Sequence, residues 1–314
     1  MRKHGFTQRG TPRWRCVRCR STGIKTRADT TLRHARHRAL TWLTGKKNLT
    51  DVAAGQHRTR QTISKQLKRI FRTVASWSPP KEISILVLDG IYIHGRLLMA
   101  LIGLADGGNL VWSFAPKETR DTWDILLKKL PEPQVVVCDG HGGLLASIKA
   151  LWPNCAIQRC QFHVLKLART YLTLNPKSIA GMELKNILAT LVTRRTKLAA
   201  QEFEELIQSW CVQHDSLLTE RSHSFDARGK KHWWYTHKKL RGARSLMVNA
   251  LPNLFTFLDY PECPNTTNAI EGGVNAQLAE GLRLHRGLRL HQKPTLISFL
   301  LAKITHTKAT RKVT

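Results

Sequence analysis

The chain has 314 residues, and its 51 Lys and Arg against 21 Asp and Glu give a formal net charge of +30 at pH 7. Hydrophobic residues make up 42% of the sequence, which excludes a disordered basic tail and indicates a globular protein with a substantial core. So large a charge favours a polyanionic partner, because each phosphate contact releases counterions. The charge is spread along the chain and not confined to one amphipathic helix. Nucleic acid is therefore favoured over the alternative, an anionic membrane surface.

The sequence predicts no targeting or membrane-spanning segment. Residues 1–5 lead into further arginines instead of an apolar region, and the longest apolar stretch, 97–105, is about half the length of a membrane-spanning helix. The seven cysteines are an odd number, so we expect reduced thiols in a cytoplasmic protein.

Residues 1–29 are predicted to form a basic arm with one Cys-x-x-Cys pair, Cys16 and Cys19. A zinc ribbon joins two such pairs, because tetrahedral zinc needs four ligands. His34 and His37 could complete a site but fit better on the next helix. We therefore expect half a zinc ribbon without structural zinc, the other half lying upstream of the first residue or having been lost.

Residues 30–77 are predicted to form a three-helix DNA-binding domain. The first helix runs through Leu43, a short second helix has Thr50 as its N-cap, Gly55 allows a tight turn, and the third helix opens at Thr59. A short helix, a glycine turn and a helix with a polar, cationic outer face are typical of a helix-turn-helix. An ordinary helical hairpin with a solvated basic face is the alternative. The residues expected to contact DNA are Gln61, Ser64, Lys65, Lys68 and Arg72.

Residues 82–174, after a proline-containing linker, are predicted to form the first part of an α/β catalytic domain. Three strands come first, and strands and helices then alternate. This is the element order of a ribonuclease-H-like sheet. The expected strands are 83–94, 96–105, 109–115, 135–138 and 156–159, and the expected helices are 119–130, 142–151 and 162–174.

Residues 175–262 are predicted to be an all-α insertion, because charges alternate at helical spacing and no strand pattern is evident. Residues 263–314 are predicted to complete the catalytic domain and to end in a basic tail. Within the insertion, Trp233 and Trp234 lie among cations that include Arg241, which suits base stacking beside a phosphate track. The alternative is packing in the core of the insertion, and we expect that for at least one of the two tryptophans.

Two apolar runs end on an Asp-Gly pair, at Asp89 and at Asp139. Such runs are typical of strands buried on both faces, where a carboxylate is costly unless a cation or hydrogen bonds stabilise it. Two carboxylates from one sheet therefore suggest a shared cation. A third candidate is Glu271, which the helical spacing of Ile270 and Val274 places beside a buried face.

Each carboxylate has its alternative. Asp139 could cap the helix expected at 142–151, and Glu271 alone could be an ordinary surface residue, whereas the apolar run continues beyond Asp89. Gly272 and Gly273 each cost about 1 kcal/mol in a helix relative to Ala. They predict a close backbone approach to the sheet or to a phosphate. Two divalent ions roughly 4 Å apart would suit phosphoryl transfer, and Mg²⁺ suits oxygen ligands.

Four segments of the sequence resemble motifs of bacterial mutator-type transposases, which belong to the Mutator-like (MULE) superfamily of insertion-sequence DDE transposases. The segments are 88–90, 138–140, 159–163 and 267–272, within a resemblance that covers about residues 30–305. The resemblance implies a ribonuclease-H-like catalytic domain with Asp89, Asp139 and Glu271 as the acidic triad. It also implies two Mg²⁺ ions, with Mn²⁺ able to substitute, and cleavage and joining of DNA strands.

The resemblance further implies DNA as the partner, as transposon terminal repeats and as target, and a homo-oligomer on DNA in the bacterial nucleoid. The family's Cys-x-x-His signature falls on Cys160 and His163. His163 is expected to orient a catalytic carboxylate or to contact a phosphate. A satisfied core histidine, or a zinc ligand together with Cys155 and Cys160, is the alternative.

Two rival functions stay open. One is a domesticated, non-catalytic DNA-binding regulator, which three converging carboxylates disfavour. The other is a structure-specific nuclease on the same fold, which a helix-turn-helix disfavours because such an enzyme needs no reader of transposon ends.

Overall fold

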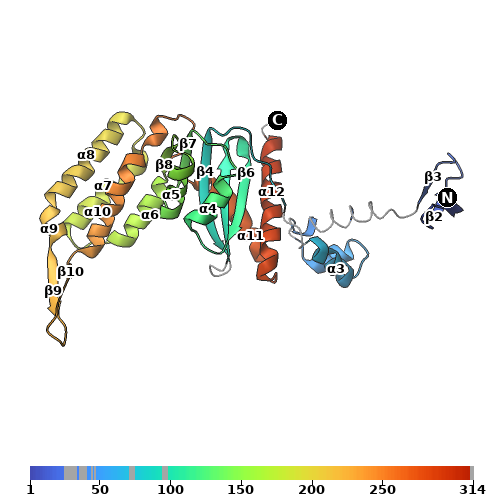
Figure 1. The fold of residues 1–314 in the computed structure, drawn as a ribbon, viewed down its shortest axis with the longest axis horizontal. Coiled ribbons are helices and arrows are strands. Elements are labelled where there is room, and N and C mark those ends of the chain that lie inside the picture. The colour runs from blue at the N-terminus through green and yellow to red at the C-terminus, as the bar shows by residue number, and fades with distance from the viewer. Residues whose placement is uncertain are drawn as a thin grey trace. The chain divides into compact units, whose positions relative to one another are not determined.

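The protein is described by a computed structural model, in which two compact units are distinguished (Figure 1). The first unit comprises residues 1–76 and 278–303, and the second comprises 77–277 and 304–314. Residues 278–303 thus group with the N-terminal part of the chain, whereas the sequence-based division assigns them to the catalytic domain. The residues described are 1–24, 34, 41–43, 45, 47–70, 75–93 and 98–311.

The first unit begins with a three-stranded antiparallel sheet in the order β1-β2-β3. The strands are β1 (Arg2–Phe6), β2 (Pro12–Arg15) and β3 (Thr22–Ile24). The segment predicted as a basic arm therefore contains regular strands. They are short and β1 is exposed throughout, so the sequence carries no alternation of buried and exposed positions that would have indicated them.

The next helices are α2 (Leu49–Ala54) and α3 (Arg60–Ile70), each with buried apolar side chains on one side. The N-cap of α2 is Asn48, whose side chain accepts a hydrogen bond from the Asp51 N–H at 2.9 Å, so the predicted cap at Thr50 is wrong. The residue with positive φ in the following turn is His57, at 50°, and not Gly55, at −63°. The predicted first helix lies mostly outside the described residues.

Two C-terminal helices, α11 (Ala276–Leu284) and α12 (Lys293–Arg311), cross the division between the units, with the short η6 (Leu290–Gln292) between them. In the first unit, the buried His285 ring donates to the Leu43 carbonyl at 3.1 Å and lies edge-on to Trp42, with ring centroids 4.5 Å apart. Burial lowers the pKa of His285, so this ring is held neutral.

The second unit is built on a five-stranded mixed sheet in the order β6-β5-β4-β7-β8. The β4, β5 and β6 strands are antiparallel neighbours, whereas β7 and β8 continue the sheet in parallel from β4. All five predicted strands and the α/β class are confirmed. The strands are β4 (Ile85–Ile93), β5 (Leu98–Ala105), β6 (Leu110–Ala115), β7 (Val135–Cys138) and β8 (Ala156–Arg159), with the short η1 (Asp106–Gly108) between β5 and β6.

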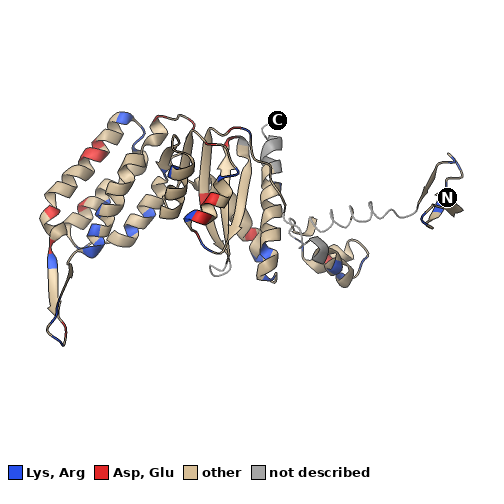
Figure 2. Ribbon diagram, in the orientation of Figure 1, with Lys and Arg blue, Asp and Glu red and all other residues tan. Residues whose placement is uncertain are grey.

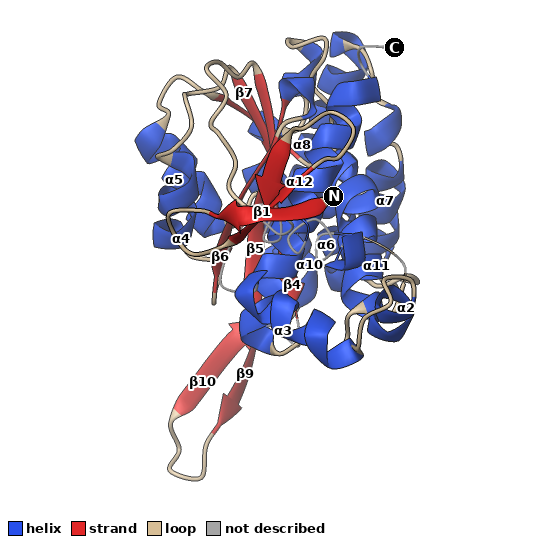
Figure 3. Cartoon of the chain, turned by 90° about the vertical axis from the view of Figure 1, so that its right-hand side faces the viewer, coloured by secondary structure: helices blue, strands red, loops and turns tan. Residues whose placement is uncertain are grey.

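Helices cover both faces of this sheet. The helices α4 (Arg120–Leu127) and α5 (Gly142–Leu151) lie on one side of it and α6 (Gln161–Leu172) on the other (Figure 3). Leu86 and Leu88 of β4 join the buried cluster formed with α4 and α5. Because side chains alternate along a strand, Asp89 points to the opposite face.

The insertion contains a bundle of helices and a β-hairpin that projects from one end of it (Figure 1). Its elements are α7 (Ile179–Ala189), η2 (Leu191–Thr193), α8 (Lys197–Gln213), α9 (Asp215–Thr219), β9 (Arg221–Phe225), β10 (Lys231–Tyr235), α10 (Lys238–Ala250), η3 (Leu251–Asn253) and η4 (Thr256–Leu258). The prediction of an all-α insertion is therefore wrong. Asp226 accepts two backbone hydrogen bonds in the hairpin turn, and Gly229 has a φ of 73° there.

The two tryptophans of the hairpin are exposed, Trp233 by 50% and Trp234 by 47%. The expectation that at least one of them packs in the core of the insertion is wrong. Trp210 of α8 fills that place, with its indole N–H donating to the Ala180 carbonyl at 3.0 Å. Among the described helices of both units, none is long and apolar enough to span a membrane.

Candidate active site

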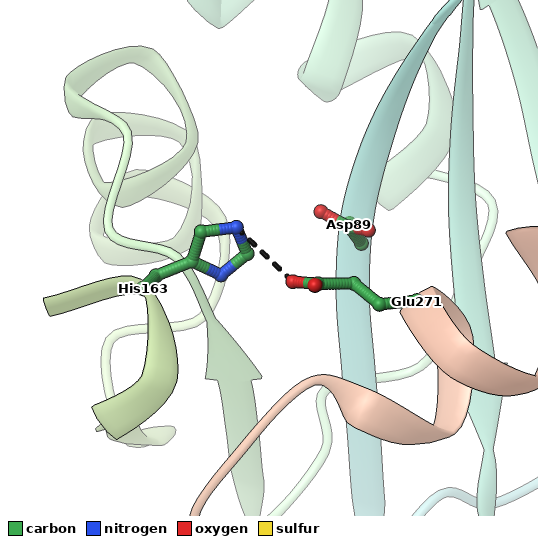
Figure 4. A group of neighbouring side chains, drawn as sticks. All are labelled: Asp89, His163 and Glu271. Carbon is green, nitrogen blue, oxygen red and sulfur yellow. Dashed lines mark ion pairs between the residues drawn. The ribbon is translucent and has the colours of Figure 1, made fainter. Parts of the chain in front are cut away.

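Asp89, His163 and Glu271 converge on the sheet face opposite α4 and α5 (Figure 4). They come from β4, from α6 and from a π-helix, η5 (Ala269–Asn275), which packs against β4. One ligand atom from each residue lies within 4.8 Å of the other two. The structure therefore brings together side chains that are 74 or more positions apart in the chain, as their numbers show.

Asp89 is a buried carboxylate, with only 8% of the residue exposed. One of its oxygens accepts a hydrogen bond from the Asn275 side-chain amide at 3.2 Å. Burial raises the pKa of Asp89 to about 6, and the negative charges of Glu271 and Asp139 act in the same direction, while His163 opposes them. The carboxylate is thus held where burial disfavours its charged form.

Glu271 is positioned by the buried residues beside it in η5. Ile270 and Val274 are fully buried, as their spacing predicts, and Glu271 projects toward Asp89 and His163. Its Oε1 accepts a hydrogen bond from the Thr267 hydroxyl at 3.1 Å. Such π-helical turns are frequently found at functional sites.

Gly272 and Gly273 follow Glu271, and a Cβ atom at either position would meet nothing within 4 Å. The expected close approach of this backbone to the sheet is therefore wrong. The other possibility, that a phosphate approaches the two glycines, stays a prediction.

His163 lies between the carboxylates and the thiol of Cys160. Its Nε2 is 3.1 Å from Glu271 Oε1 (dashed line in Figure 4). A hydrogen bond with Cys160 raises the pKa of His163 to about 9, and the charges of Glu271 and Asp89 reinforce the shift although burial opposes it. The raised pKa favours the protonated imidazole, whose positive charge offsets part of the negative charge of the two carboxylates.

The zinc interpretation of Cys155, Cys160 and His163 finds no support in this geometry. The Cys160 sulfur accepts hydrogen bonds from the backbone N–H groups of His163, at 3.5 Å, and Thr267, at 3.3 Å. In the part of the chain that the structure describes, the group of potential metal ligands contains neither cysteine.

Asp139 follows β7 at a position that matches Asp89 on β4. Val87 and Val137 are paired in the parallel register, and each aspartate follows two residues later, so both belong to the same face of neighbouring strands about 4.8 Å apart. Asp139 is not a member of the closest group of ligand atoms, but its charge contributes to the raised pKa of Asp89. Helix α5 has His141 as its N-cap, so Asp139 does not cap that helix.

The carboxylate oxygens of Asp89, Glu271 and Asp139 fit a hard divalent cation such as Mg²⁺, which prefers oxygen ligands. His163 belongs to the same group of potential ligands, but its imidazole could bind a cation only after losing a proton, because the protonated ring has no lone pair to offer. It fits better as the group that holds Glu271 in place.

Glu118 is a residue near the site that the sequence analysis missed. Its side chain is only 10% exposed, its Oε1 accepts a hydrogen bond from the buried Trp123 indole at 3.0 Å, and the same oxygen lies 3.6 Å from His141 Nδ1. Burial raises the pKa of Glu118, and the charge of Asp139 contributes. In the sequence, Glu118 looks like part of an ordinary helix start, immediately before the N-cap Thr119.

The residues predicted to contact DNA through α3 differ in their exposure to solvent, and some of them are not described by the structure. Gln61 and Lys65 are exposed, and Ser64 is half-buried. The side chain of Lys68 and all of Arg72 lie outside the described residues. Lys and Arg occur on elements of both units and not on one helix alone (Figure 2).

Trp233 of the hairpin and Arg241 of α10 are both engaged within the protein. The Arg221 guanidinium lies 4.3 Å from the Trp233 ring, and the Arg241 guanidinium lies 3.5 Å from the Tyr235 ring. Arg241 also donates to the Leu218 carbonyl at 2.6 Å. Trp234 points to the other face of the strand, where it pairs across the hairpin with Ser222.

An α/β sheet with carboxylates gathered on one face of β4 and at the end of β7 defines a candidate metal site. Residues 46–227 match the family described as Transposase, Mutator family, and the chain belongs to this family. It is similar to a transposase for insertion sequence element ISRM5 from Rhizobium meliloti (strain 1021), with 29% identity over 126 residues. It is also similar to a probable transposase for an insertion sequence element from Corynebacterium diphtheriae, with 28% identity over 85 residues.

These two matches cover parts of the chains. The first spans 35% of this chain and 32% of the relative, and the second spans 26% and 25%. The family membership agrees with the resemblance found in the sequence, which names insertion-sequence transposases of the mutator type.

Proposed function

We propose that this protein is the transposase of an insertion sequence and that it catalyses metal-dependent cleavage and joining of DNA strands. The observation that carries the proposal is the convergence of Asp89 and Glu271 on one face of the sheet, with Asp139 at the matching position of the neighbouring strand. A pure DNA-binding protein has no use for buried carboxylates with a raised pKa.

The proposal includes a ribonuclease-H-like catalytic domain. The order β6-β5-β4-β7-β8, with three antiparallel strands followed by two parallel ones, supports it. In a ribonuclease-H-like fold the first and fourth strands of the sheet are neighbours, as β4 and β7 are in this chain. Asp89 lies on β4, and Asp139 directly follows β7.

Asp89, Asp139 and Glu271 would hold two Mg²⁺ ions, and Mn²⁺ would take the same ligands. When bound, such ions stabilise both the attacking and the leaving oxygen of an in-line phosphoryl transfer. The chain's own residues orient the ligands. Asn275 binds Asp89, while His163 and Thr267 hold Glu271.

DNA binding is proposed for two places in the chain. The helices α2 and α3 would form a helix-turn-helix that reads the terminal repeats, with Gln61 and Lys65 exposed for base contacts. The hairpin would contact DNA through Trp234, because the Arg221 guanidinium already packs over the ring of Trp233. Bringing two transposon ends together with target DNA requires more than one chain, so we propose a homo-oligomer on DNA.

The test is a cleavage and joining assay with the full chain and DNA that carries the terminal repeats flanking its gene. The Asp89→Asn, Asp139→Asn and Glu271→Gln variants should bind this DNA but neither cleave nor join it. The exposed Asp121 of α4 offers a matched control, and Asp121→Asn should behave as the wild type. Specific binding without cleavage by the wild type would indicate a regulator. Cleavage that ignores the repeats and joins nothing would indicate a nuclease.

A further inference from the structure

The loop that carries Asp139 is held in place by residues from neighbouring elements. The Asp139 carboxylate accepts a hydrogen bond from the His141 backbone N–H at 2.8 Å. The Asp139 carbonyl accepts a hydrogen bond from Arg159 Nε at 3.2 Å. Gly140, between Asp139 and His141 in the chain, has a φ of 83°. A Cβ atom at Gly140 would overlap the Arg159 guanidinium, which occupies the space that a side chain would need. The orientation of Asp139 therefore depends on the path of residues 139–141.

We propose that Glu118 is a positioning residue for Asp139, acting through His141. The inference rests on the proposed function, because it assigns a supporting residue to the same metal site. Glu118 has the contacts that this role needs. Its Oε1 lies 3.6 Å from His141 Nδ1 and is fixed on the other side by the Trp123 indole at 3.0 Å. Trp123 is fully buried, so the carboxylate is anchored to the core of the unit.

Glu118 lies behind the metal site and not among its ligands. A Cβ atom at Gly90 would point to the α4 and α5 face and would lie 3.8 Å from the Glu118 carboxyl carbon. Asp89 points to the opposite face, toward Glu271 and His163. Glu118 is also absent from the group of potential metal ligands among the described residues. Its contact with the loop after β7 is through His141, and the charges of Asp139 and His163 also act on it at longer range.

The role explains why a carboxylate is present at this position. Glu118 is close enough to Asp139 for the two negative charges to repel, which is unfavourable in a buried place. His141 is partly exposed at the start of α5, where nothing else that the structure describes pairs with its ring. A carboxylate 3.6 Å from the His141 Nδ1 restrains the ring, and this restraint limits the movement of the backbone N–H that binds Asp139. Supporting residues of this kind commonly change metal affinity by 10-fold to 100-fold.

The experiment measures Mn²⁺ binding to the full chain by calorimetry. Mn²⁺ affinity is first compared between the wild type and Asp89→Asn. If the wild type binds no Mn²⁺, the proposed function is overturned together with this inference. If the wild type binds, Glu118→Gln should weaken binding about tenfold while the melting temperature stays the same or rises. The amide oxygen of Gln still accepts from Trp123, so the fold is retained. Glu132→Gln is the matched control, since Glu132 accepts a backbone hydrogen bond from Asn154 at 2.8 Å at the opposite end of β7.

A double-mutant cycle separates positioning from the loss of a nearby negative charge. If Glu118 acts through His141, Glu118→Gln should have little further effect in a His141→Ala background. Amide hydrogen exchange in residues 139–143 should also be faster in Glu118→Gln than in Glu132→Gln. Fully additive losses would show a long-range charge effect and would overturn the inference. A lowered melting temperature with unchanged Mn²⁺ affinity would show a packing role and would overturn it as well. His141→Ala tests the same link if Glu118→Gln does not fold.

Discussion

Two regions of the second unit contain side chains in unusual environments. The metal-site face of the sheet buries a carboxylate, whereas the β9–β10 hairpin exposes aromatic rings to solvent. On the sheet, the Asp89 carboxylate is buried, and this burial raises its pKa to about 6. In the hairpin, Trp233, Trp234 and Phe225 are between 47% and 69% exposed. Buried charge and exposed aromatic surface both cost free energy, so each region is better explained by a ligand than by stability.

The two regions differ in how firmly they hold these side chains. Asp89 is fixed by Asn275 on a central strand, and Glu271 by His163 and Thr267. In the hairpin, β9 and β10 pair with each other in a two-stranded sheet, and Trp234 is 47% exposed. A preorganised site suits chemistry that needs fixed geometry, whereas an exposed hairpin suits contact with a flexible polymer.

The largest expected effect is the loss of catalysis when a sheet carboxylate loses its charge. Asp89→Asn or Glu271→Gln should lower the rate of DNA cleavage roughly 1000-fold or more, because stabilisation of the reacting oxygens amounts to several kcal/mol. Binding to terminal-repeat DNA should change less than twofold. Single-turnover cleavage and gel-shift titration of the same preparations measure both. Robust Mg²⁺-dependent cleavage by a variant would remove that residue from the catalytic set.

The next effect concerns stability without metal. A folded-state pKa near 6, against 3.8 for the free side chain, means that protonated Asp89 stabilises the fold below about pH 4. This contribution, about 3 kcal/mol, is lost as the pH rises through 6. In a chelator, Asp89→Asn should therefore be more stable than the wild type at pH 7.5 and similar to it at pH 4. Urea unfolding across this range measures the difference, and parallel pH profiles of the two proteins would contradict it.

A smaller effect is expected at the loop behind Asp139. Gly140→Ala should destabilise the protein by about 2 kcal/mol, since a φ of 83° is strained for any residue with a Cβ and Arg159 must move. Gly142→Ala is the matched control, because a Cβ there meets nothing within 4 Å. Equal melting temperatures for the two variants would show that Arg159 does not depend on the space at Gly140.

The sheet could be predicted from the sequence, because a strand buried on both faces has to be continuously apolar. The predicted 83–94 and the observed Ile85–Ile93 differ by one or two residues at each end. From that strand and from β7, the positions of Asp89 and Asp139 follow by alternation and register. The burial of Ile270 and Val274 was predictable from their helical spacing, and with it the position of Glu271 beside a buried face.

The hairpin and Glu118 could not be predicted in this way. The β9 sequence Arg-Ser-His-Ser-Phe has no buried face, so no apolar period marks it as a strand. The proposed role of Glu118 depends on its contact with His141, which lies 23 positions further along the chain. Only the packing of α4 against α5 creates this contact. The spacing of apolar residues in a sequence indicates which positions are buried. It does not indicate an exposed hairpin or a contact between side chains that only the packing of two helices creates.

The smallest expected effect distinguishes the two adjacent tryptophans of the hairpin. Trp234→Ala should weaken binding to single-stranded or distorted DNA by about 1 kcal/mol, because its exposed ring has no aromatic or cationic partner among the described residues. Trp233→Ala should instead act on the hairpin itself, since Arg221 and Tyr235 pack against Trp233. Fluorescence anisotropy with a labelled oligonucleotide measures the first effect, and limited proteolysis near Gly229 measures the second. Equal loss of binding with an equally stable hairpin in both variants would show that the two rings share one role. In that case the two faces of β10 would not differ in function, although Trp233 packs against Arg221 and Trp234 lies on the opposite face.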